Sequence, residues 1–323
     1  MGSRRDPGGG GMADAQFRPR ARIQAVVVSY NARDALLECV ASLRREGVEE
    51  IVVVDNGSSD GSTEALADAD VAVKLVVPGR NLGFGGGVNH GARRCTGDLL
   101  LVCNPDIVLQ PGAVPALERR IESDPSLGLV GPRFVAPDGS ERPSGRAFPT
   151  VRRSSVHAAL GLVAPGSARS DRYRAASRAG AATGIVDWVT GACFLVRRDA
   201  FESVGGFDER YFMYVEEVDL CMRLARAGWR TGVEPGAVVL HLAGVSTSAH
   251  PYRMLAAHHI SLWRFAWRWT RGTGRLVLPL VAPAVVLRLV VGSLKVLWSR
   301  PARAPARAPA RAPGGSRRPR HRA

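Results

Sequence analysis

Three sets of polar residues in the sequence could carry out chemistry, and the first is the segment Asn104-Pro105-Asp106. It follows the apolar run D-L-L-L-V-C, so its oxygen atoms stand at the end of a predicted strand. A carboxylate with a second polar oxygen two residues earlier suits a hard divalent cation that keeps some waters and bridges a diphosphate. Asn, Pro and Asp are also ordinary turn formers. Alone, the segment predicts either a cation site or a turn.

The second set is the acidic cluster Glu216, Glu217 and Asp219 at the start of a predicted helix. Three carboxylates within four residues could be solvated charge that the helix dipole favours. One of them could instead be a general base that removes a proton from an acceptor hydroxyl. The third candidate is His241, which follows the apolar run G-A-V-V-L. It becomes a credible metal ligand only beside other ligands.

The elements that would position these residues alternate along the first third of the chain. Apolar runs predict strands at 23–28, 51–54, 71–78 and 98–103, and helical patterns predict helices at 35–45 and 88–95. This alternation is typical of an α/β fold with a parallel sheet and crossover helices. Ligands bind beyond the carboxyl ends of the strands in such sheets. We therefore expect the strand-exit residues to face one crevice: Ser29, Tyr30, Asp55, Asn56, Asn81, Asn104 and Asp106.

Residues 77–91, V-P-G-R-N-L-G-F-G-G-G-V-N-H-G, are rich in glycine. They lack the Lys-Ser/Thr ending of a P-loop, and they do not follow the first strand as a dinucleotide fingerprint does. We expect a loop whose glycines let the backbone pass close to a bound nucleotide, with polar contacts from Asn81 and Asn89.

Positive charge is concentrated at the two ends of the chain, whose formal net charge is +15. Residues 301–323 carry seven arginines and no acid, and residues 1–22 carry five arginines against two aspartates. Both ends are too poor in large apolar residues to fold, so we predict disorder at 1–22 and 300–323. The charge favours anionic membrane surfaces or nucleic acid. Because the body contains no nucleic-acid recognition motif, no nucleic-acid partner is expected.

Two further features bear on the compartment. The five cysteines are odd in number and lie in apolar stretches, which predicts buried, reduced thiols in the cytoplasm. The first apolar run is only six residues, too short for a secretory signal.

Towards the C-terminus, W-R-F-A-W-R-W precedes L-V-L-P-L-V-A-P-A-V-V-L, which is too short and proline-rich for a secure membrane span. We predict that 251–299 is a helical amphipathic segment at a membrane interface. A packed helical subdomain is the alternative.

The order and combination of the motifs resemble glycosyltransferase family 2. The resemblance runs from about residue 23 to about residue 250, and it is far more specific than any single motif. Within the family it is closest to bacterial rhamnosyltransferases, to which L-A-A-H-H at 255–259 is also similar. The motifs that carry it are V-V-V-S-Y-N, V-V-V-D-N-G-S-S-D-G-S, R-N-L-G-F-G-G-G-V-N-H-G, C-N-P-D, W-V-T-G-A-C-F-L-V-R-R, G-G-F-D-E-R-Y-F-M-Y-V-E-E-V-D-L-C-M-R and V-L-H-L.

The resemblance implies a GT-A fold at 23–250, a Rossmann-like nucleotide-sugar-binding domain with a mostly parallel central sheet. It further implies inverting, Mg- or Mn-dependent transfer of L-rhamnose from dTDP-L-rhamnose to a polyprenyl-diphosphate-linked GlcNAc in cell-wall polysaccharide synthesis. Such an enzyme would be cytoplasmic and peripheral on the inner face of the cell membrane. Transfer of mannose, galactofuranose or GlcNAc stays open, as does a non-catalytic nucleotide-sugar-binding homologue. The presence of Asp106, Glu217 and His241 together argues against the last alternative. The oligomeric state stays open.

The resemblance also assigns roles to residues. Two departures from the family pattern matter: Asn104 stands where the first Asp of the Asp-x-Asp metal motif is expected, and Glu217 stands where the base is usually Asp. Glu216 and Asp219 therefore remain alternative bases. The implied donor-binding residues are Ser29, Tyr30, Asp55, Asn81, Gly83, Asn89 and Asn104; the metal ligands are Asp106 and His241; the base is Glu217 or Asp219; and the acceptor-side residues are Trp188, Gly191 and Glu216.

Overall fold

The computed structural model describes residues 21–69, 72–149, 184–242 and 251–272, together with isolated positions between 275 and 290. The ends predicted to be disordered fall almost wholly outside the described residues, as does most of the region after 272. None of the helices in the described part is long and apolar enough to cross a membrane.

The N-terminal part alternates strands and helices as predicted, and its four strands are parallel in the order β3-β2-β1-β4. The predicted third strand, 71–78, is reduced to three residues. The elements are β1 (Ile23–Ser29), α1 (Arg33–Arg45), β2 (Glu50–Asp55), α2 (Ser62–Asp68), β3 (Lys74–Val76), α3 (Gly83–Ala92) and β4 (Leu99–Cys103).

The second part extends the same sheet in the order β4-β11-β6-β12-β5 and makes it mixed. β12 is parallel to β6, whereas β11 is antiparallel to both its neighbours and β5 is antiparallel to β12. The elements are β5 (Ile107–Leu109), α4 (Ala113–Glu122), β6 (Leu127–Val135), β7 (Glu141–Arg142), β8 (Gly145–Arg146), β9 (Ile185–Val186), β10 (Trp188–Val189), β11 (Cys193–Arg197), α7 (Arg198–Ser203), α8 (Glu216–Arg226), β12 (Arg230–His241) and α9 (Pro251–Trp269).

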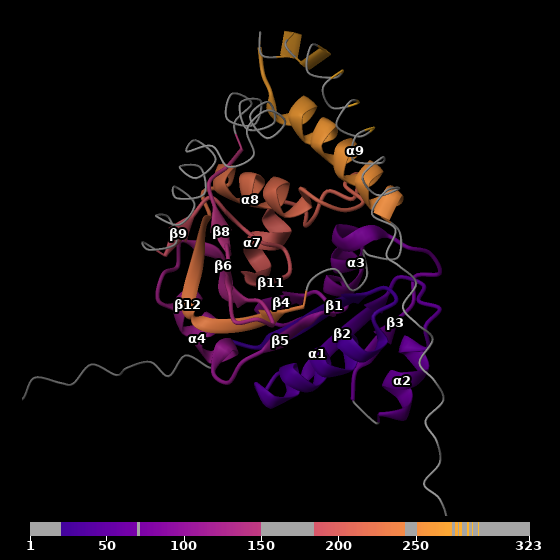
Figure 1. Ribbon diagram of the computed structural model, residues 1–323. Coiled ribbons are helices and arrows are strands. Elements are labelled where there is room, and N and C mark those ends of the chain that lie inside the picture. Colours follow the sequence, from indigo (N-terminus) through magenta and orange to yellow (C-terminus); the bar gives the residue numbers. More distant parts are fainter. Residues whose placement is uncertain are drawn as a thin grey trace, which may run out of the picture.

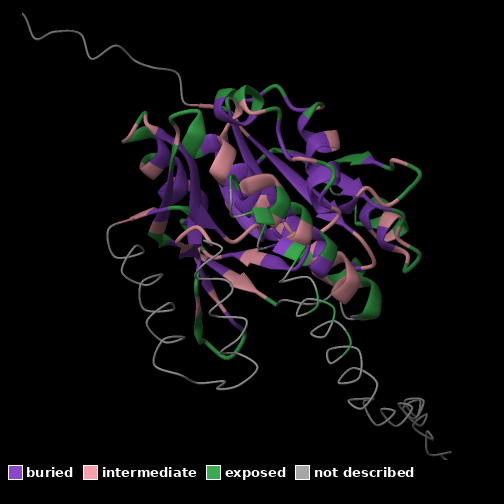
Figure 2. Cartoon of the chain, turned by 90° about the horizontal axis from the view of Figure 1, so that it is seen from above, coloured by how far each residue is buried: buried purple, intermediate pink, exposed green. Residues whose placement is uncertain are grey.

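Helices cover both faces of the sheet, which explains why its central strands β1 and β4 carry apolar residues on both faces (Figures 1 and 2). Ala25 and Val27 of β1 point into the core under α1, α2 and α4. Val26 and Val28 point into the core under α3, α7 and α8, and Phe265 of α9 belongs to the same core. All five cysteines are buried and free, as the sequence predicts.

The glycine-rich stretch corrects one prediction, because it is largely helical rather than a loop. Helix α3 begins at Gly83, five residues before the predicted start. A Cβ on Gly87 would lie 2.7 Å from Val28 Cγ1, and one on Gly91 would lie 2.5 Å from Val26 Cγ1. These glycines therefore let α3 lie directly on β1. The low helix propensity of glycine hid this helix, since close packing overrides propensity.

Substituting Gly91 by Ala is expected to destabilise the protein by about 1–3 kcal/mol, the usual cost of overpacking a close contact. The new methyl would meet two valines of the sheet, Val26 at 2.5 Å and Val54 at 3.0 Å. Urea unfolding measures the loss. Gly86→Ala is the matched control in the same helix, because its methyl meets only Leu82 Cβ, at 3.1 Å. Equal stability of the two variants would contradict the packing role of Gly91.

Helix α9 packs on the domain rather than standing apart from it. Trp269 Nε1 donates to Asp219 Oδ1 of α8 over 2.8 Å, and Ser261 Oγ donates to the Met213 carbonyl over 2.8 Å. Phe265 is buried in the core of that face. The first helix of the segment 251–299 therefore packs on the domain. This agrees with the alternative prediction for that segment, a packed helical subdomain.

Candidate active site

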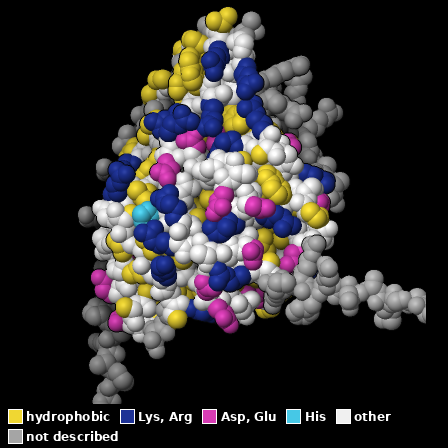
Figure 3. Space-filling view, turned by 180° about the vertical axis from the view of Figure 1, so that it is seen from behind, with side chains coloured by type: hydrophobic (Ala, Val, Ile, Leu, Met, Phe, Trp, Pro, Cys, Tyr) yellow, Lys and Arg dark blue, Asp and Glu magenta, His cyan; other side chains and the backbone are white. Residues whose placement is uncertain are grey.

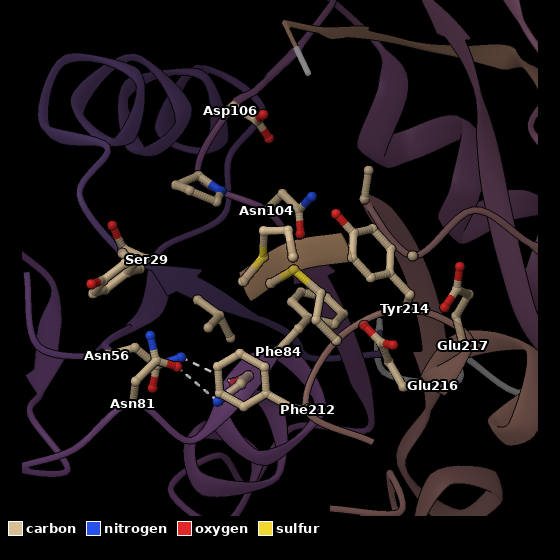
Figure 4. A pocket seen from close by; sticks show the side chains of 18 of the residues that line it. Ser29, Asn56, Asn81, Phe84, Asn104, Asp106, Phe212, Tyr214, Glu216 and Glu217 are labelled. Atoms are coloured by element: carbon tan, nitrogen blue, oxygen red, sulfur yellow. Dashed lines mark hydrogen bonds between the residues drawn. The ribbon is translucent and has the colours of Figure 1, made fainter. Parts of the chain in front are cut away.

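A cavity of about 320 Å³ opens beyond the carboxyl ends of β1, β2 and β4, where the strand-exit rule places it. Figure 4 shows Ser29, Asn56 and Asn81 along one side of the cavity and Glu216 and Glu217 on the opposite side. Asn104 and Asp106 lie between these two sides. Eleven of the residues predicted to face the site line the cavity: Ser29, Tyr30, Asn56, Asn81, Gly83, Asn104, Asp106, Gly191, Glu216, Glu217 and His241.

The side of the cavity formed by the strand exits is held by two asparagines. Asn56 Nδ2 donates to the Gly83 carbonyl over 3.0 Å, and Asn81 Oδ1 accepts the Gly83 N–H over 2.9 Å. Gly83 has φ +74°, and a Cβ there would lie 2.0 Å from the Phe212 carbonyl oxygen, so this position requires glycine. Ser29 Oγ is buried without a hydrogen-bond partner in the described protein, which leaves it free for a ligand.

Asp55 stands behind this side and does not line the cavity. Its Oδ1 accepts the N–H groups of Gly57 and Ser58 over 2.8 and 2.7 Å, so it shapes the turn after β2. Its Oδ2 is buried without a partner among the described residues. Only that second oxygen remains available for the donor contact that the sequence predicts.

Asp106 and His241 meet although 135 positions separate them in the sequence. β12 pairs with β5 so that His241 lies opposite Ile107, and His241 Nε2 comes within 3.4 Å of Asp106 Oδ1. Asp106 is 6% exposed, and its Oδ1 has no hydrogen-bond partner. Antiparallel pairing at the sheet edge therefore builds this pair.

The pair fits a divalent cation. No group of three or more His, Cys, Asp or Glu residues in the described part of the chain could hold a metal ion, so the protein offers two ligands here. Mg²⁺ and similar cations are commonly held by one or two protein ligands together with waters and substrate phosphates. An unpartnered buried carboxylate oxygen beside an imidazole matches that mode of binding. Asn104, also in the cavity, adds a neutral amide rather than a second charge.

Glu216 and Glu217 face the cavity from the first turn of α8. The two preceding residues, Tyr214 and Val215, have φ of 68° and 70°, which is strained for non-glycine residues. This turn directs both carboxylates into the cavity opposite the strand exits (Figure 4). Burial raises the pKa of Glu216 well above its usual value, and the neighbouring charge of Glu217 raises it further. Burial also raises the pKa of Glu217, while Arg146 lowers it.

Substituting Arg146 by Gln is expected to move the acid limb of the pH–rate profile to higher pH. Arg146 favours the ionised form of Glu217, so its removal raises the pKa of that carboxyl. A base must be deprotonated, so activity at low pH falls and activity at high pH is retained. The profile of kcat/KM against pH measures the shift. Arg142→Gln removes the same charge from neighbouring β7 and should leave the limb in place; equal shifts would contradict the assignment.

Asp219, an alternative base in the sequence prediction, faces away from the cavity. It is fully buried; its Oδ2 pairs with Arg223 Nε over 2.8 Å and its Oδ1 accepts from Trp269 Nε1 over 2.8 Å. Two residues correspond to about 200° of rotation around a helix, so Asp219 and Glu217 lie on nearly opposite sides of α8. Asp219 therefore joins α8 to α9, and these contacts favour Glu216 and Glu217 over Asp219 as the base.

Substituting Asp219 by Asn is expected to lower the free energy of unfolding by about 3–5 kcal/mol, the usual cost of removing one partner of a buried ion pair. Arg223 and Trp269 would lose the carboxylate that they share. Denaturant unfolding measures this loss, and kcat per folded molecule should change little. Unchanged stability with a large loss of kcat would restore Asp219 as a base candidate.

Two more predicted residues lie outside the cavity. Asn89 exchanges hydrogen bonds with the backbone of Phe207: its Nδ2 donates to the carbonyl over 2.9 Å and its Oδ1 accepts the N–H over 2.8 Å. It thus links α3 to the segment before α8 instead of reaching a donor. Trp188 donates from Nε1 to the Ala147 carbonyl over 3.0 Å and lies under the Arg146 guanidinium. It supports the strand beside the cavity.

Several lining residues have no counterpart in the sequence prediction: Thr190, Phe212, Met213, Tyr214, Arg253 and Met254. Arg253 and Met254 come from α9 and add a cation and a flexible apolar side chain to the cavity. The motif L-A-A-H-H at 255–259 extends the family resemblance to this helix. Nothing in the sequence indicates that Arg253 and Met254, just before the motif, reach the strand exits.

Comparisons with known proteins agree with this geometry. The model of the family described as "Glycosyl transferase family 2" matches residues 24–205, and that of "Glycosyl transferase family group 2" matches residues 166–302. The chain is 38% identical over 272 residues to N-acetylglucosaminyl-diphospho-decaprenol L-rhamnosyltransferase of Mycobacterium tuberculosis, covering 77% of this chain and 88% of that protein. It is 25% identical over 229 residues to rhamnosyltransferase WbbL of Escherichia coli, covering 68% and 83%.

Among solved structures, a mannosyltransferase from Pyrobaculum calidifontis in complex with GDP-Man and Mn2+ superposes with a TM-score of 0.53 at 17% identity. The match covers 87% of this chain and 76% of that one. It shows a shared fold.

Proposed function

This chain belongs to glycosyltransferase family 2, and we propose that it transfers L-rhamnose from dTDP-L-rhamnose to GlcNAc carried on a polyprenyl diphosphate, with inversion. The observation that carries the proposal is that one cavity brings Asp106 and His241 together with the strand exits, while Glu216 and Glu217 stand on its opposite side. The name of the mycobacterial relative supports the sugar and the acceptor. The product would serve cell-wall polysaccharide synthesis.

The strand-exit side is the donor side. Ser29 ends β1 and Tyr30 follows it, and both are placed to contact the nucleotide, with Asn81 and Gly83 beside its diphosphate. Asp106 and His241 would hold a divalent cation, Mg²⁺ or Mn²⁺, at the diphosphate. When bound, that cation supplies positive charge for the leaving nucleoside diphosphate. Asn104 keeps the local negative charge low.

Glu217 is the proposed base. The acceptor hydroxyl loses its proton to the Glu217 carboxylate as its oxygen attacks the anomeric carbon, and the bond from that carbon to the β-phosphate oxygen breaks on the opposite face. Attack and departure on opposite faces invert the configuration. Glu216 is the weaker candidate, since it is only 5% exposed and both burial and the Glu217 charge raise its pKa.

The acceptor enters beside Gly191. A Cβ on Gly191 would lie 3.3 Å from Glu217 Cβ, so glycine leaves room for an acceptor next to the base. Arg253, at the same cavity, is a candidate for the acceptor diphosphate. Because a polyprenyl chain holds its sugar at a bilayer surface, we place the enzyme on the cytoplasmic face of the membrane as a peripheral protein.

The proposal is tested by supplying the protein with a panel of labelled sugar nucleotides, a GlcNAc-diphospho-polyprenol acceptor, and Mg²⁺ or Mn²⁺. Label should enter the lipid fraction from dTDP-L-rhamnose and depend on both acceptor and cation. Transfer from a mannose, galactofuranose or GlcNAc donor alone would overturn the sugar assignment. The absence of transfer from every donor, with donor binding intact, would favour a nucleotide-sugar-binding role.

A further inference from the structure

A second cavity, of about 590 Å³, lies along the C-terminal half of α9, and we call it the α9 cleft. It shares no lining residue with the active site, and none of the described residues that line it is acidic. Its walls carry four arginines and three aromatic residues, namely Arg210, Arg264, Arg268, Arg275, Tyr211, Trp263 and Trp267.

The positive charge of the α9 cleft is only partly balanced. Asp208, beside the cleft, pairs with Arg210 over 2.6 Å and also with Arg268. The hydrogen bonds from Arg210 and the charges of both arginines lower the pKa of Asp208 to about 2. Arg264 donates to the Arg210 carbonyl, and Arg275 donates to the Thr270 carbonyl over 3.0 Å. Neither Arg264 nor Arg275 pairs with a carboxylate of the described residues. The cleft therefore offers two uncompensated guanidinium groups to an anion.

The surface around the α9 cleft favours a lipid over a soluble anion. Tyr252, Ile260 and Trp267 are 44%, 52% and 49% exposed and recur at seven- and eight-residue intervals, so they share one face of α9. Trp267 also carries the Arg275 guanidinium at 5.5 Å from its ring. Aromatic and aliphatic side chains interspersed with arginines are typical of helices that lie in a membrane interface. Figure 3 shows Lys and Arg side chains gathered in the upper part of the molecule, next to exposed hydrophobic ones.

We propose that the α9 cleft binds the phosphate of an anionic phospholipid headgroup while the exposed face of α9 contacts the bilayer. Arg264 and Arg275 would bind the phosphate, and Trp267 would lie at headgroup level. Arg253 and Met254, at the other end of α9, line the active site. Thirteen residues of helix span about 20 Å, so docking would hold the active-site mouth close to the bilayer surface. This last step rests on the proposed lipid-linked acceptor; headgroup binding does not.

Vesicle co-sedimentation of the full chain tests the proposal without donor or acceptor. The protein should bind vesicles of phosphatidylcholine mixed with phosphatidylglycerol and bind pure phosphatidylcholine much more weakly. The double variant R264Q/R275Q should lose about fivefold in vesicle affinity for each arginine, the usual attraction of one basic residue to an anionic surface. Trp267→Ala should weaken vesicle binding without changing net charge. Thermal unfolding verifies that each variant is folded.

The matched control is R45Q/R119Q, which removes the same charge from exposed positions on α1 and α4, on the other side of the sheet from α9 (Figure 1). Equal losses in the two double variants would overturn the α9 cleft as the docking site, as would equal binding of the wild type to both kinds of vesicle. Quenching of tryptophan fluorescence by inorganic phosphate, without vesicle binding, would assign the cleft to a soluble anion instead. If vesicle binding follows the prediction but no sugar is transferred, the proposed function fails and the docking site stands.

Discussion

Replacing Glu217 by Gln is expected to lower kcat about 10²–10⁴-fold, the usual contribution of a general base. The amide keeps the size of the side chain but cannot accept the proton of the acceptor hydroxyl. Donor binding should persist, because Glu217 stands across the cavity from Ser29 and Asn81 (Figure 4). Single-turnover transfer measures the first effect, and calorimetric titration with the nucleotide sugar measures the second.

Glu216→Gln is the matched control for that experiment. The two carboxylates are adjacent in sequence and face the same cavity, but burial and the Glu217 charge raise the pKa of Glu216 well above its usual value. An amide in place of this carboxyl, whose ionised form is disfavoured, should therefore change kcat far less than the Glu217 substitution does. If Glu216→Gln caused the larger loss, the roles of the two residues would be exchanged. Loss of donor binding in Glu217→Gln would point to a donor-site role.

The strand-exit side of this site is predictable from local sequence because of how parallel sheets are built. Ser29, Asn81, Asn104 and Asp106 each follow an apolar run, and the carboxyl ends of parallel strands meet at one edge. This inference does not require knowing which strand pairs with which. The helical phase of α8 does not by itself separate the carboxylates, because Asp219 lies three residues beyond Glu216 and therefore near the same face. The contacts of Asp219 with Arg223 and Trp269 set it apart, and they are visible only in the structure.

The remaining parts of the site depend on long-range packing. His241 reaches Asp106 only because β12 pairs with β5, and the pattern of either strand does not specify that partner. Arg253 reaches the cavity only because α9 packs on α8, through contacts such as Trp269 with Asp219. Before the structure was known, the family resemblance was the only ground for grouping His241 with Asp106. No motif indicated Arg253.

Replacing Asp106 by Asn is expected to lower kcat/KM about a hundredfold or more, as removal of a group that stabilises developing charge does elsewhere. The amide is nearly isosteric, so the backbone hydrogen bond from Leu242 N to the Asp106 carbonyl, 3.0 Å long, should persist. The negative charge that would hold a cation beside His241 is lost. The donor should then bind with little dependence on Mn²⁺, whereas it should bind the wild type more tightly when Mn²⁺ is present. Calorimetric titrations with and without the cation measure the difference.

The matched variant is Asn104→Asp, which adds a carboxylate two residues earlier in the same turn and recreates the Asp-x-Asp pattern. It should tighten cation binding, since a second charged oxygen would face the cavity beside Asp106. Opposite changes in Mn²⁺ affinity from substitutions two residues apart are difficult to attribute to misfolding. Should both variants leave the Mn²⁺ dependence of donor binding unchanged, the leaving diphosphate must be neutralised by protein cations instead, and Arg253 is the arginine that lines the described cavity.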